Sequence, residues 1–209
     1  MRTYFIRYQH IIVLFSLLLG LIFSGICDGF IAAENVSDKS LRLHILAQSD
    51  STEDQAVKLL VRDKLLSCGA EILEGSENAN EAAEKVIANK DYLISVADKI
   101  LEENGFSYKT DIVIEEEYYE TRQYENIRLP AGKYLSCKVI LGNGKGKNWW
   151  CIMFPPLCIP AATKKTDDSI YSIYKENGVN LVTEQGGYEI KFRIVELIEE
   201  LINEIRSKN

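Results

Sequence analysis

The chain has 209 residues, of which 46% are hydrophobic, and its formal net charge is −7. This composition is typical of a globular protein, and 4 prolines and 13 glycines are too few for extensive disorder. The length suits one domain of ordinary size. Phosphate backbones are bound by clustered Lys and Arg, which the acidic body of this chain lacks, so the composition excludes nucleic acid as the partner.

The N-terminal residues 1–33 differ in kind from the rest. Arg2 and Arg7 precede an uncharged, apolar run over residues 11–27. A positive start followed by an apolar segment predicts a signal peptide. The run also approaches the roughly 20 residues that span a bilayer, so an uncleaved signal anchor is the alternative. In both cases we expect a polar linker over residues 34–40 and a single exported domain over residues 41–209.

Cysteine usage agrees with export. One of the five cysteines, Cys27, lies in the export segment, which leaves four in the body: Cys68, Cys137, Cys151 and Cys158. Disulfides are permitted outside the cytoplasm, and four cysteines allow three complete pairings. The local pair Cys151–Cys158 is favoured among them.

The first half of the body predicts a strand followed by helices. Residues 41–48 alternate between apolar and polar, as a strand does. Ser51 is placed to cap a helix, with Asp54 as its partner three residues on, and Gly69 offers a stop. Residues 81–88 and 91–103 carry two further amphipathic patterns, the second of which ends at Gly105.

The second half predicts strands. From Tyr108 the period changes to two, as in a half-exposed strand of an antiparallel sheet. The glycine-rich residues 142–147 separate two more strands, 139–141 and 149–154, which predicts a hairpin. An apolar stripe over residues 194–205 predicts a last helix. The fold class expected is α+β: a single domain with an antiparallel sheet and helices packed on one face.

The sequence GNGKGK at residues 142–147 resembles a phosphate loop only superficially. A phosphate loop needs Ser or Thr after its GK and a helix whose N-terminus faces the anion, but Asn148 and a strand follow here. A glycine-rich turn between strands accounts for the same residues. Lys145 and Lys147 then form a small positive tip suited to an acidic partner.

Three groups of residues could in principle support catalysis or metal binding. Cys137 or Cys151 with the body's single histidine, His44, is a conceivable nucleophile and base, and the same residues with Cys158 are a conceivable zinc set. The zinc set lacks a compact CxxC spacing. The acidic run at residues 115–117 is interpreted as a solvated strand face. We therefore predict no catalytic residues, no metal and no cofactor.

The stretch NWWCIMFPPLCIP at residues 148–160 concentrates aromatic, cysteine and proline residues. A Cys151–Cys158 bridge would contribute on the order of 2–3 kcal/mol by closing a short loop. Trp149 and Trp150 point to opposite faces of a strand, so one can join the core while the other stays partly exposed. The stretch is thus either a disulfide-closed loop that only stabilises the fold, or such a loop that also presents a docking surface.

Two blocks, HILAQSDSTEDQAVKLLVRD at residues 44–63 and LPAGKY to WWCIMFPPLC within residues 129–158, closely resemble those of the stage II sporulation protein R family of endospore-forming Firmicutes. In this chain Gln48 stands where the family usually has Asn, and Thr52 where Pro is common. The resemblance implies a signal exported from the forespore into the intermembrane space of the sporulation septum. The resemblance also implies that this signal activates a membrane-embedded aspartic protease of the mother cell that processes pro-sigma-E, and peripheral membrane contact is part of the same expectation.

On this basis we expect the partner-binding surface to be formed by twelve residues of the two blocks: Ser49, Asp50, Asp54, Gln55, Arg62, Asp63, Asn148, Trp149, Trp150, Phe154, Pro155 and Pro156. The alternative function is an exported hydrolase acting at the septal cell wall, with His44, Asp50 and Asp63 near one another. A further alternative is an anchored structural protein of the septum.

Overall fold

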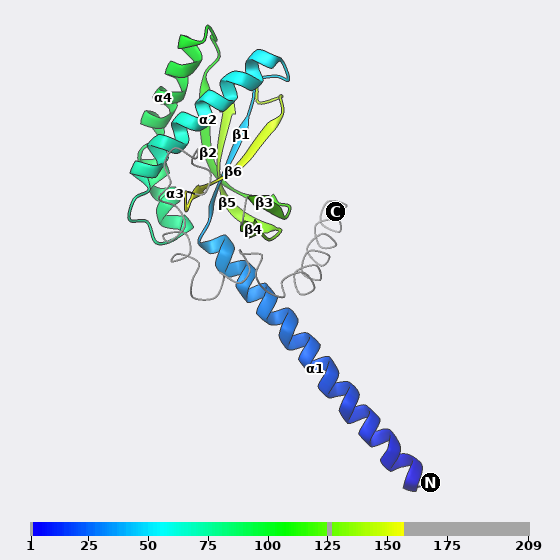
Figure 1. Cartoon of the computed structure of the whole chain (residues 1–209). Coiled ribbons are helices and arrows are strands. Elements are labelled where there is room, and N and C mark those ends of the chain that lie inside the picture. Colours follow the sequence, from blue (N-terminus) through cyan, green and yellow to red (C-terminus); the bar gives the residue numbers. More distant parts are fainter. Residues whose placement is uncertain (1, 125–126, 157–209) are drawn as a thin grey trace.

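The computed structural model of the chain describes residues 2–124 and 127–156. These residues form four helices and six strands (Figure 1): α1 Arg2–Asp38, β1 Leu41–Leu46, α2 Thr52–Ile72, α3 Ala79–Ala88, α4 Lys90–Glu103, β2 Thr110–Tyr119, β3 Arg122–Tyr124, β4 Ile127–Leu129, β5 Gly132–Leu141 and β6 Asn148–Phe154. The predicted last helix over residues 194–205 lies outside the described residues.

Four strands form one sheet in the order β2-β5-β1-β6, and β3 pairs with β4 in a separate ribbon. The β2–β5 and β1–β6 pairs are antiparallel, as expected, but the central β1–β5 pair is parallel. The α+β class with helices on one face is therefore confirmed, whereas the sheet is mixed and not wholly antiparallel. Parallel pairing is possible because three helices, β2 and the β3–β4 ribbon separate β1 from β5 and allow the chain to cross back.

The predicted hairpin across residues 142–147 is wrong. β5 and β6 do run in opposite directions, but β1 lies between them and pairs with both. The strand closest in sequence is therefore not the strand closest in space. Every residue of Leu41–Leu46 except Leu46 is buried, because a central strand is covered on both edges and both faces.

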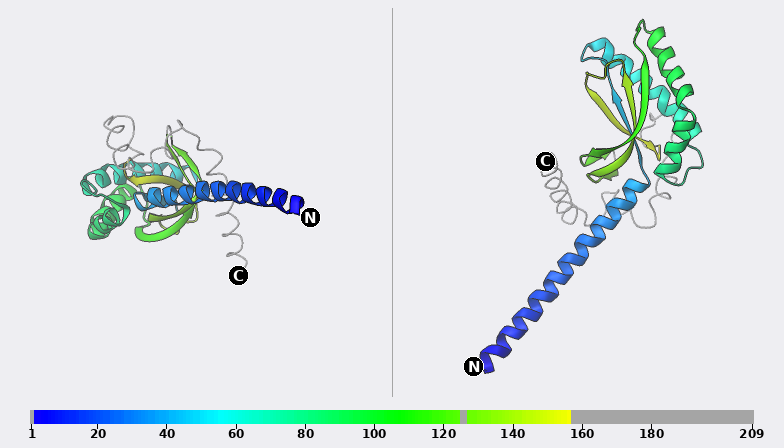
Figure 2. Two further views of the ribbon diagram at one scale, coloured as in Figure 1. Left: turned by 90° about the horizontal axis from the view of Figure 1, so that it is seen from below. Right: turned by 180° about the vertical axis from the view of Figure 1, so that it is seen from behind.

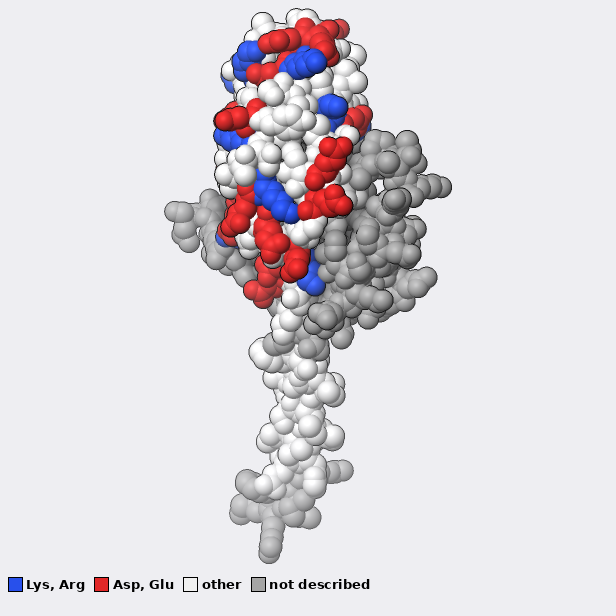
Figure 3. Space-filling model, turned by 90° about the vertical axis from the view of Figure 1, so that its left-hand side faces the viewer, with Lys and Arg blue, Asp and Glu red and all other residues white. Residues whose placement is uncertain are grey.

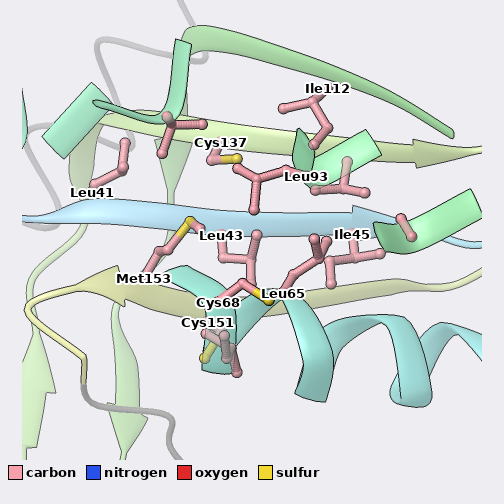
Figure 4. Packing of buried hydrophobic residues seen from close by; sticks show 14 of the residues in the cluster. Leu41, Leu43, Ile45, Leu65, Cys68, Leu93, Ile112, Cys137, Cys151 and Met153 are labelled. Carbon is pink, nitrogen blue, oxygen red and sulfur yellow. The ribbon is translucent and has the colours of Figure 1, made fainter. Parts of the chain in front are cut away.

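Helices α2, α3 and α4 lie on one face of the sheet (Figure 2). The hydrophobic core lies between these helices and the sheet, where Leu43 and Ile45 of β1 pack with Leu65 of α2 and Leu93 of α4 (Figure 4). Cys137 of β5 is part of the same core, and its thiol is free. The apolar positions of β1 that face this layer are the ones that its alternating sequence predicts.

The start of α2 is the best-signalled element boundary in the chain. Ser51 is its N-cap, and its hydroxyl accepts a hydrogen bond from the Asp54 amide at 3.1 Å. The predicted stop at Gly69 is wrong, since α2 continues to Ile72. The glycine instead makes room for Met153 of β6, whose Cε would lie 2.7 Å from a side-chain Cβ at position 69.

The helix α1 projects from one end of the domain (Figures 1 and 2). Its apolar side chains between Tyr8 and Phe23 are exposed, and Figure 3 shows this part as an uncharged rod beneath a domain rich in acidic side chains. Within the described residues, no helix has both the length and the apolar character needed to cross a membrane. The signal or anchor role of residues 1–33 stays a prediction.

The segment predicted as a polar linker, residues 34–40, is structured. It forms the last turn of α1 and the two residues that precede β1. Val36 is fully buried, and the Ser40 hydroxyl donates a hydrogen bond to the Val36 carbonyl at 2.6 Å. α1 contacts β5 and α3, so the end of the helix packs as part of the domain.

Candidate partner-binding site

Two loops at one end of the sheet are hydrogen-bonded to each other, and together we call them the tip. Residues 47–51 join β1 to α2, and residues 142–147 join β5 to β6. Three amides of the second loop donate to the first: Gly146 N to Ala47 O at 2.8 Å, Lys147 N to Asp50 Oδ1 at 2.6 Å, and Asn143 N to Gln48 Oε1 at 2.5 Å. The two blocks singled out in the sequence thus meet in space.

The start of α2 is fixed by a hydrogen-bonded carboxylate. Asp54 is buried and accepts from the hydroxyls of Ser49 at 2.5 Å and Tyr108 at 2.7 Å. Burial alone would raise the pKa of Asp54, but the hydrogen bonds from Ser49, Tyr108 and Ser51 outweigh it and lower that pKa. The Asp54 carboxylate is therefore engaged by hydrogen bonds from within the domain.

A buried lysine connects α2 to the second loop of the tip. Lys58 is 3% exposed, and its Nζ donates to Gln55 Oε1 at 2.6 Å and to the Lys147 carbonyl at 2.8 Å. Gln55 in turn donates from Nε2 to the Ser49 carbonyl at 2.8 Å. Burial lowers the pKa of Lys58. Gln55, one of the predicted partner-binding residues, is thus hydrogen-bonded to the tip and to Lys58.

Beside the tip, β6 and α2 form an aromatic and cationic pair. The guanidinium of Arg62 lies 4.3 Å from the ring centroid of Trp149. The same guanidinium binds Asp63 through Nε at 2.8 Å and Nη2 at 2.6 Å. Trp149 is half-buried and packs against the hydrophobic core. This arrangement orders two residue types that commonly dominate binding surfaces.

Trp150 lies on the opposite face of β6, as predicted. Its ring stacks on His44 with centroids 3.6 Å apart, and Tyr119 meets it edge-on at 5.0 Å. His44 Nδ1 lies 3.0 Å from Glu117 Oε2. Burial lowers the pKa of His44 and outweighs the opposing influence of Glu117. The imidazole is therefore favoured in its neutral form.

The interpretation of residues 115–117 as a solvated strand face holds for Glu116, which is exposed, but not for Glu117, whose side chain is only 16% exposed. Glu115 and Glu117 point to the same face of β2 and both accept hydrogen bonds from Lys138 Nζ, at 2.7 and 2.9 Å. The two carboxylates raise the pKa of Lys138. Burial would raise the pKa of Glu117, but bonds from Lys138 and Ser136 and the nearby His44 lower it.

Arg42 completes a polar cluster on this second face of the sheet. It is fully buried, with its guanidinium 4.2 Å from the ring centroid of Tyr119 and 5.0 Å from that of Tyr134. Tyr119 OH lies 2.7 Å from Ser136 Oγ. Sequence reasoning missed this cluster, although polar residues at alternate positions of β1, β2 and β5 signal a polar face.

The other end of β6 carries the proline-rich part of the stretch. Phe154 and Pro155 are buried, their peptide bond is cis, and Pro156 is partly buried. Cys151 takes part in a disulfide, whereas Cys68 and Cys137 carry free thiols. Cys158 lies outside the described residues, so the Cys151–Cys158 pairing stays a prediction.

The twelve predicted partner-binding residues differ in exposure. Asp50 and Asn148 are exposed, and three are buried: Asp54, Phe154 and Pro155. The remaining seven are partly exposed: Ser49, Gln55, Arg62, Asp63, Trp149, Trp150 and Pro156. Most of them line the tip and the adjoining edge of β6 and α2, whereas Trp150 lies on the second face. Their role in binding stays a prediction.

The arrangements considered for catalysis are not assembled. Cys137 is paired with Leu43 on the core face, whereas His44 is paired with Lys138 on the opposite face. Burial also raises the pKa of the Cys137 thiol to about 12. Cys151 is likewise opposite Leu43 and not His44. Neither cysteine can therefore be activated by this histidine.

The residues proposed for a hydrolase are also held apart. His44 faces Glu117 on the second face, and Asp63 lies on α2 across the sheet, bound to Arg62. Asp50 accepts from the Lys147 amide at the tip. Within residues 2–124 and 127–156, no group of three or more His, Cys, Asp and Glu residues is placed to bind a metal ion.

Comparison with known proteins identifies the family. The family model for stage II sporulation protein R matches residues 37–164, which is more than half of the chain. The chain belongs to this family. A relative named "Stage II sporulation protein R", from Bacillus subtilis (strain 168), is 28% identical over 187 residues, covering 80% of this chain and 84% of the relative. No solved structure matches.

Membership of the stage II sporulation protein R family supports a role in sporulation. The family name denotes a sporulation protein and names no enzymatic reaction. The matched residues 37–164 include β1, the start of α2 and the whole of the tip. The part of the chain that defines the family therefore includes the interlocked loops.

Proposed function

We propose that this stage II sporulation protein R family member is an exported signal that activates a membrane-embedded aspartic protease, which then processes pro-sigma-E. The family match supports the sporulation role. The observation that carries the signalling role is the interlocking of the two blocks at the tip, which fixes a polar and aromatic surface around Asp50, Asn148 and Trp149. A preorganised surface of this kind suits recognition by a partner.

Export is part of the proposal. The positive N-terminus and the apolar run at residues 11–27 favour translocation of the body into the intermembrane space of the septum. Mass spectrometry of the exported protein distinguishes a cleaved signal from a retained anchor. A chain found only in the forespore cytoplasm would contradict the proposal.

The decisive experiment is reconstitution in a host that does not sporulate. Full-length protein is co-expressed with the candidate protease and pro-sigma-E, and cleavage is followed by immunoblot. Cleavage should require both the protease and this chain. If the exported, folded chain leaves pro-sigma-E uncut, or if cleavage proceeds equally without it, the proposed function is wrong.

The aromatic edge of β6 provides the first variant for that assay. Trp149→Ala removes the ring that Arg62 covers and should abolish pro-sigma-E processing, while export and far-UV circular dichroism stay as in the wild type. Trp149→Phe keeps an aromatic ring and should retain part of the activity. Tyr92→Ala, which removes an exposed ring on α4, is the matched control and should have no effect. Full processing by a folded Trp149→Ala protein would contradict a docking role for this edge.

The second candidate, an exported hydrolase acting at the septal cell wall, rests on the His44–Glu117 pair. A histidine oriented by a carboxylate is how many enzymes hold a general base. Since Trp150 covers the His44 ring, the pair favours packing over catalysis. His44→Phe separates the two functions: a hydrolase loses all activity, whereas a folded signalling protein retains pro-sigma-E processing.

A further inference from the structure

The second loop of the tip exposes three polar residues. Along residues 142–147 the exposure alternates, because the three glycines are half-buried and the residues between and after them, Asn143, Lys145 and Lys147, are exposed. The glycine side of the loop lies against the rest of the domain. The loop therefore presents its polar side chains outward at every second position.

The backbone that carries these side chains is fixed by close packing. A Cβ at Gly142 would collide with Gln48, and a Cβ at Gly146 would collide with the carbonyl group of Ser49. The loop amides donate to residues 47–50, and Lys58 donates to the Lys147 carbonyl. The loop is thus preorganised, which reduces the entropy lost when a partner binds.

The two lysines are cations without a paired carboxylate in the described part of the chain. Neither Lys145 nor Lys147 forms a salt bridge there. Other lysines of the domain do have a carboxylate within 4.0 Å: Lys90, Lys99, Lys109, Lys133 and Lys138. In a chain of net charge −7, two neighbouring unpaired cations form a local site for an acidic ligand.

The tip lies at the end of the domain opposite to α1 (Figure 1). Two residues separate the end of α1 from β1, which leads directly to the first loop of the tip. Its six residues, at about 3.3 Å per residue, place the tip roughly 20 Å from the end of α1. The tip is therefore presented away from the N-terminal helix.

We propose that the tip binds an extended acidic segment of a partner protein, with Lys145 and Lys147 pairing to carboxylates at alternate positions of that segment. Alternate side chains of an extended segment project to the same side, so carboxylates at every second position of such a segment can face the two lysines together. The inference rests on the proposed function, in which the partner is the membrane protease.

A protein segment is favoured over an anionic lipid surface. Polybasic recruitment to membranes uses clusters of about four to eight Lys or Arg residues, and the tip offers two. Asp50 and Glu53 are exposed beside them, which disfavours a uniformly negative surface. The same acidic residues favour a partner whose charges are placed at specific positions.

The test is charge reversal in the full-length chain, Lys145→Glu with Lys147→Glu, in the reconstituted pro-sigma-E assay and in co-purification with the protease from membranes. The double variant should bind about tenfold or more weakly and process correspondingly less pro-sigma-E, because like charges then oppose each other. The amount of protease that co-purifies with the wild type should fall as NaCl is raised from 50 to 500 mM, because salt screens the attraction between the lysines and the carboxylates. The double variant should show the opposite trend, because salt screens the repulsion between its two glutamates and the acidic segment.

Lys64→Glu with Lys99→Glu is the matched control, since it changes the net charge equally on the exposed sides of α2 and α4. It should behave as the wild type. If both double variants process pro-sigma-E normally, the tip proposal is overturned while the signalling function stands. If the wild-type protein itself does not support pro-sigma-E processing, the proposed function is contradicted. Bead-bound wild type that captures phosphatidylglycerol vesicles much better than the Lys145→Glu, Lys147→Glu variant, without protease, would overturn the protein segment in favour of lipid.

Discussion

At the scale of single residues, His44 is a buried ionisable group whose neighbours come from three strands. Glu117 of β2, Lys138 of β5, and Asn148 and Trp150 of β6 face its ring. Burial lowers the pKa of His44 from its usual 6.5 in spite of the carboxylate. The folded protein therefore binds a proton on this ring less readily than the unfolded chain does.

This shift makes stability depend on pH below neutrality. As the pH falls through about 6.5, His44 becomes protonated in the unfolded chain but stays neutral in the folded protein. The free energy of unfolding therefore decreases until the pH reaches the lowered pKa of the folded state. Urea midpoints should be lower at pH 5.5 than at pH 7.5. His44→Phe should remove most of this difference, and His10→Asn should leave it. A difference that survives His44→Phe would assign the effect to another group.

Gly146 shows a residue-scale constraint at the tip. A methyl group at this position meets the Ser49 carbonyl group, which is backbone and cannot swing away. Gly146→Ala should lower the free energy of unfolding by about 1–3 kcal/mol, as overpacking does. Gly132→Ala is the control, because its Cβ would make only an ordinary contact, 3.9 Å from Tyr134. Equal urea midpoints for the two variants would show that the loop is free to move away.

At the scale of elements, local sequence signals predicted where helices begin and end, whereas the order of the strands depends on long-range pairing. The capping of α2 by Ser51 and the stop of α4 near Gly105 depend on neighbouring residues and were predicted. The position of β1 between β5 and β6 depends on residues about a hundred positions apart, for which no local pattern exists. The hairpin prediction failed for this reason.

The candidate site divides in the same way. Alternation along β6 placed Trp149 and Trp150 on opposite faces, which is confirmed. The pairing of His44 with Glu117 joins residues 73 positions apart, and period two alone does not say which strand lies beside which. The helix stop predicted at Gly69 is wrong because the glycine is required for close packing against Met153 of β6, which the local sequence does not reveal.

The cysteines of β5 and β6 give an element-scale prediction. Cys137 is buried with its pKa raised to about 12, so iodoacetamide should not label it in the native protein. In urea without reductant, Cys68 and Cys137 should be labelled and Cys151 should not. Peptide mapping under non-reducing conditions should then find Cys151 joined to Cys158. Labelling of Cys151 in the native exported protein would exclude that bridge.

At the scale of the whole molecule, α1 is joined to the domain without a flexible connection. Only two residues separate it from β1, and Val36 in its last turn is fully buried. The polar composition of residues 34–40 predicted a linker, because a single valine among polar residues does not produce the repeating apolar pattern by which a packed helix is recognised. The orientation of α1 relative to the sheet is therefore set by packing.

This packing predicts where the chain tolerates removal of its N-terminus. A protein starting at residue 34 keeps Val36 and should unfold at nearly the same urea concentration as the full-length chain. A protein starting at residue 39 loses Val36, and burying such a side chain contributes about 1.5–3 kcal/mol, so its midpoint should be clearly lower. Val36→Asp in the longer protein should reproduce the loss, because an unpaired carboxylate replaces the buried side chain. If the shorter protein is equally stable, the last turn of α1 is not part of the domain, and signal cleavage anywhere before β1 is compatible with the fold.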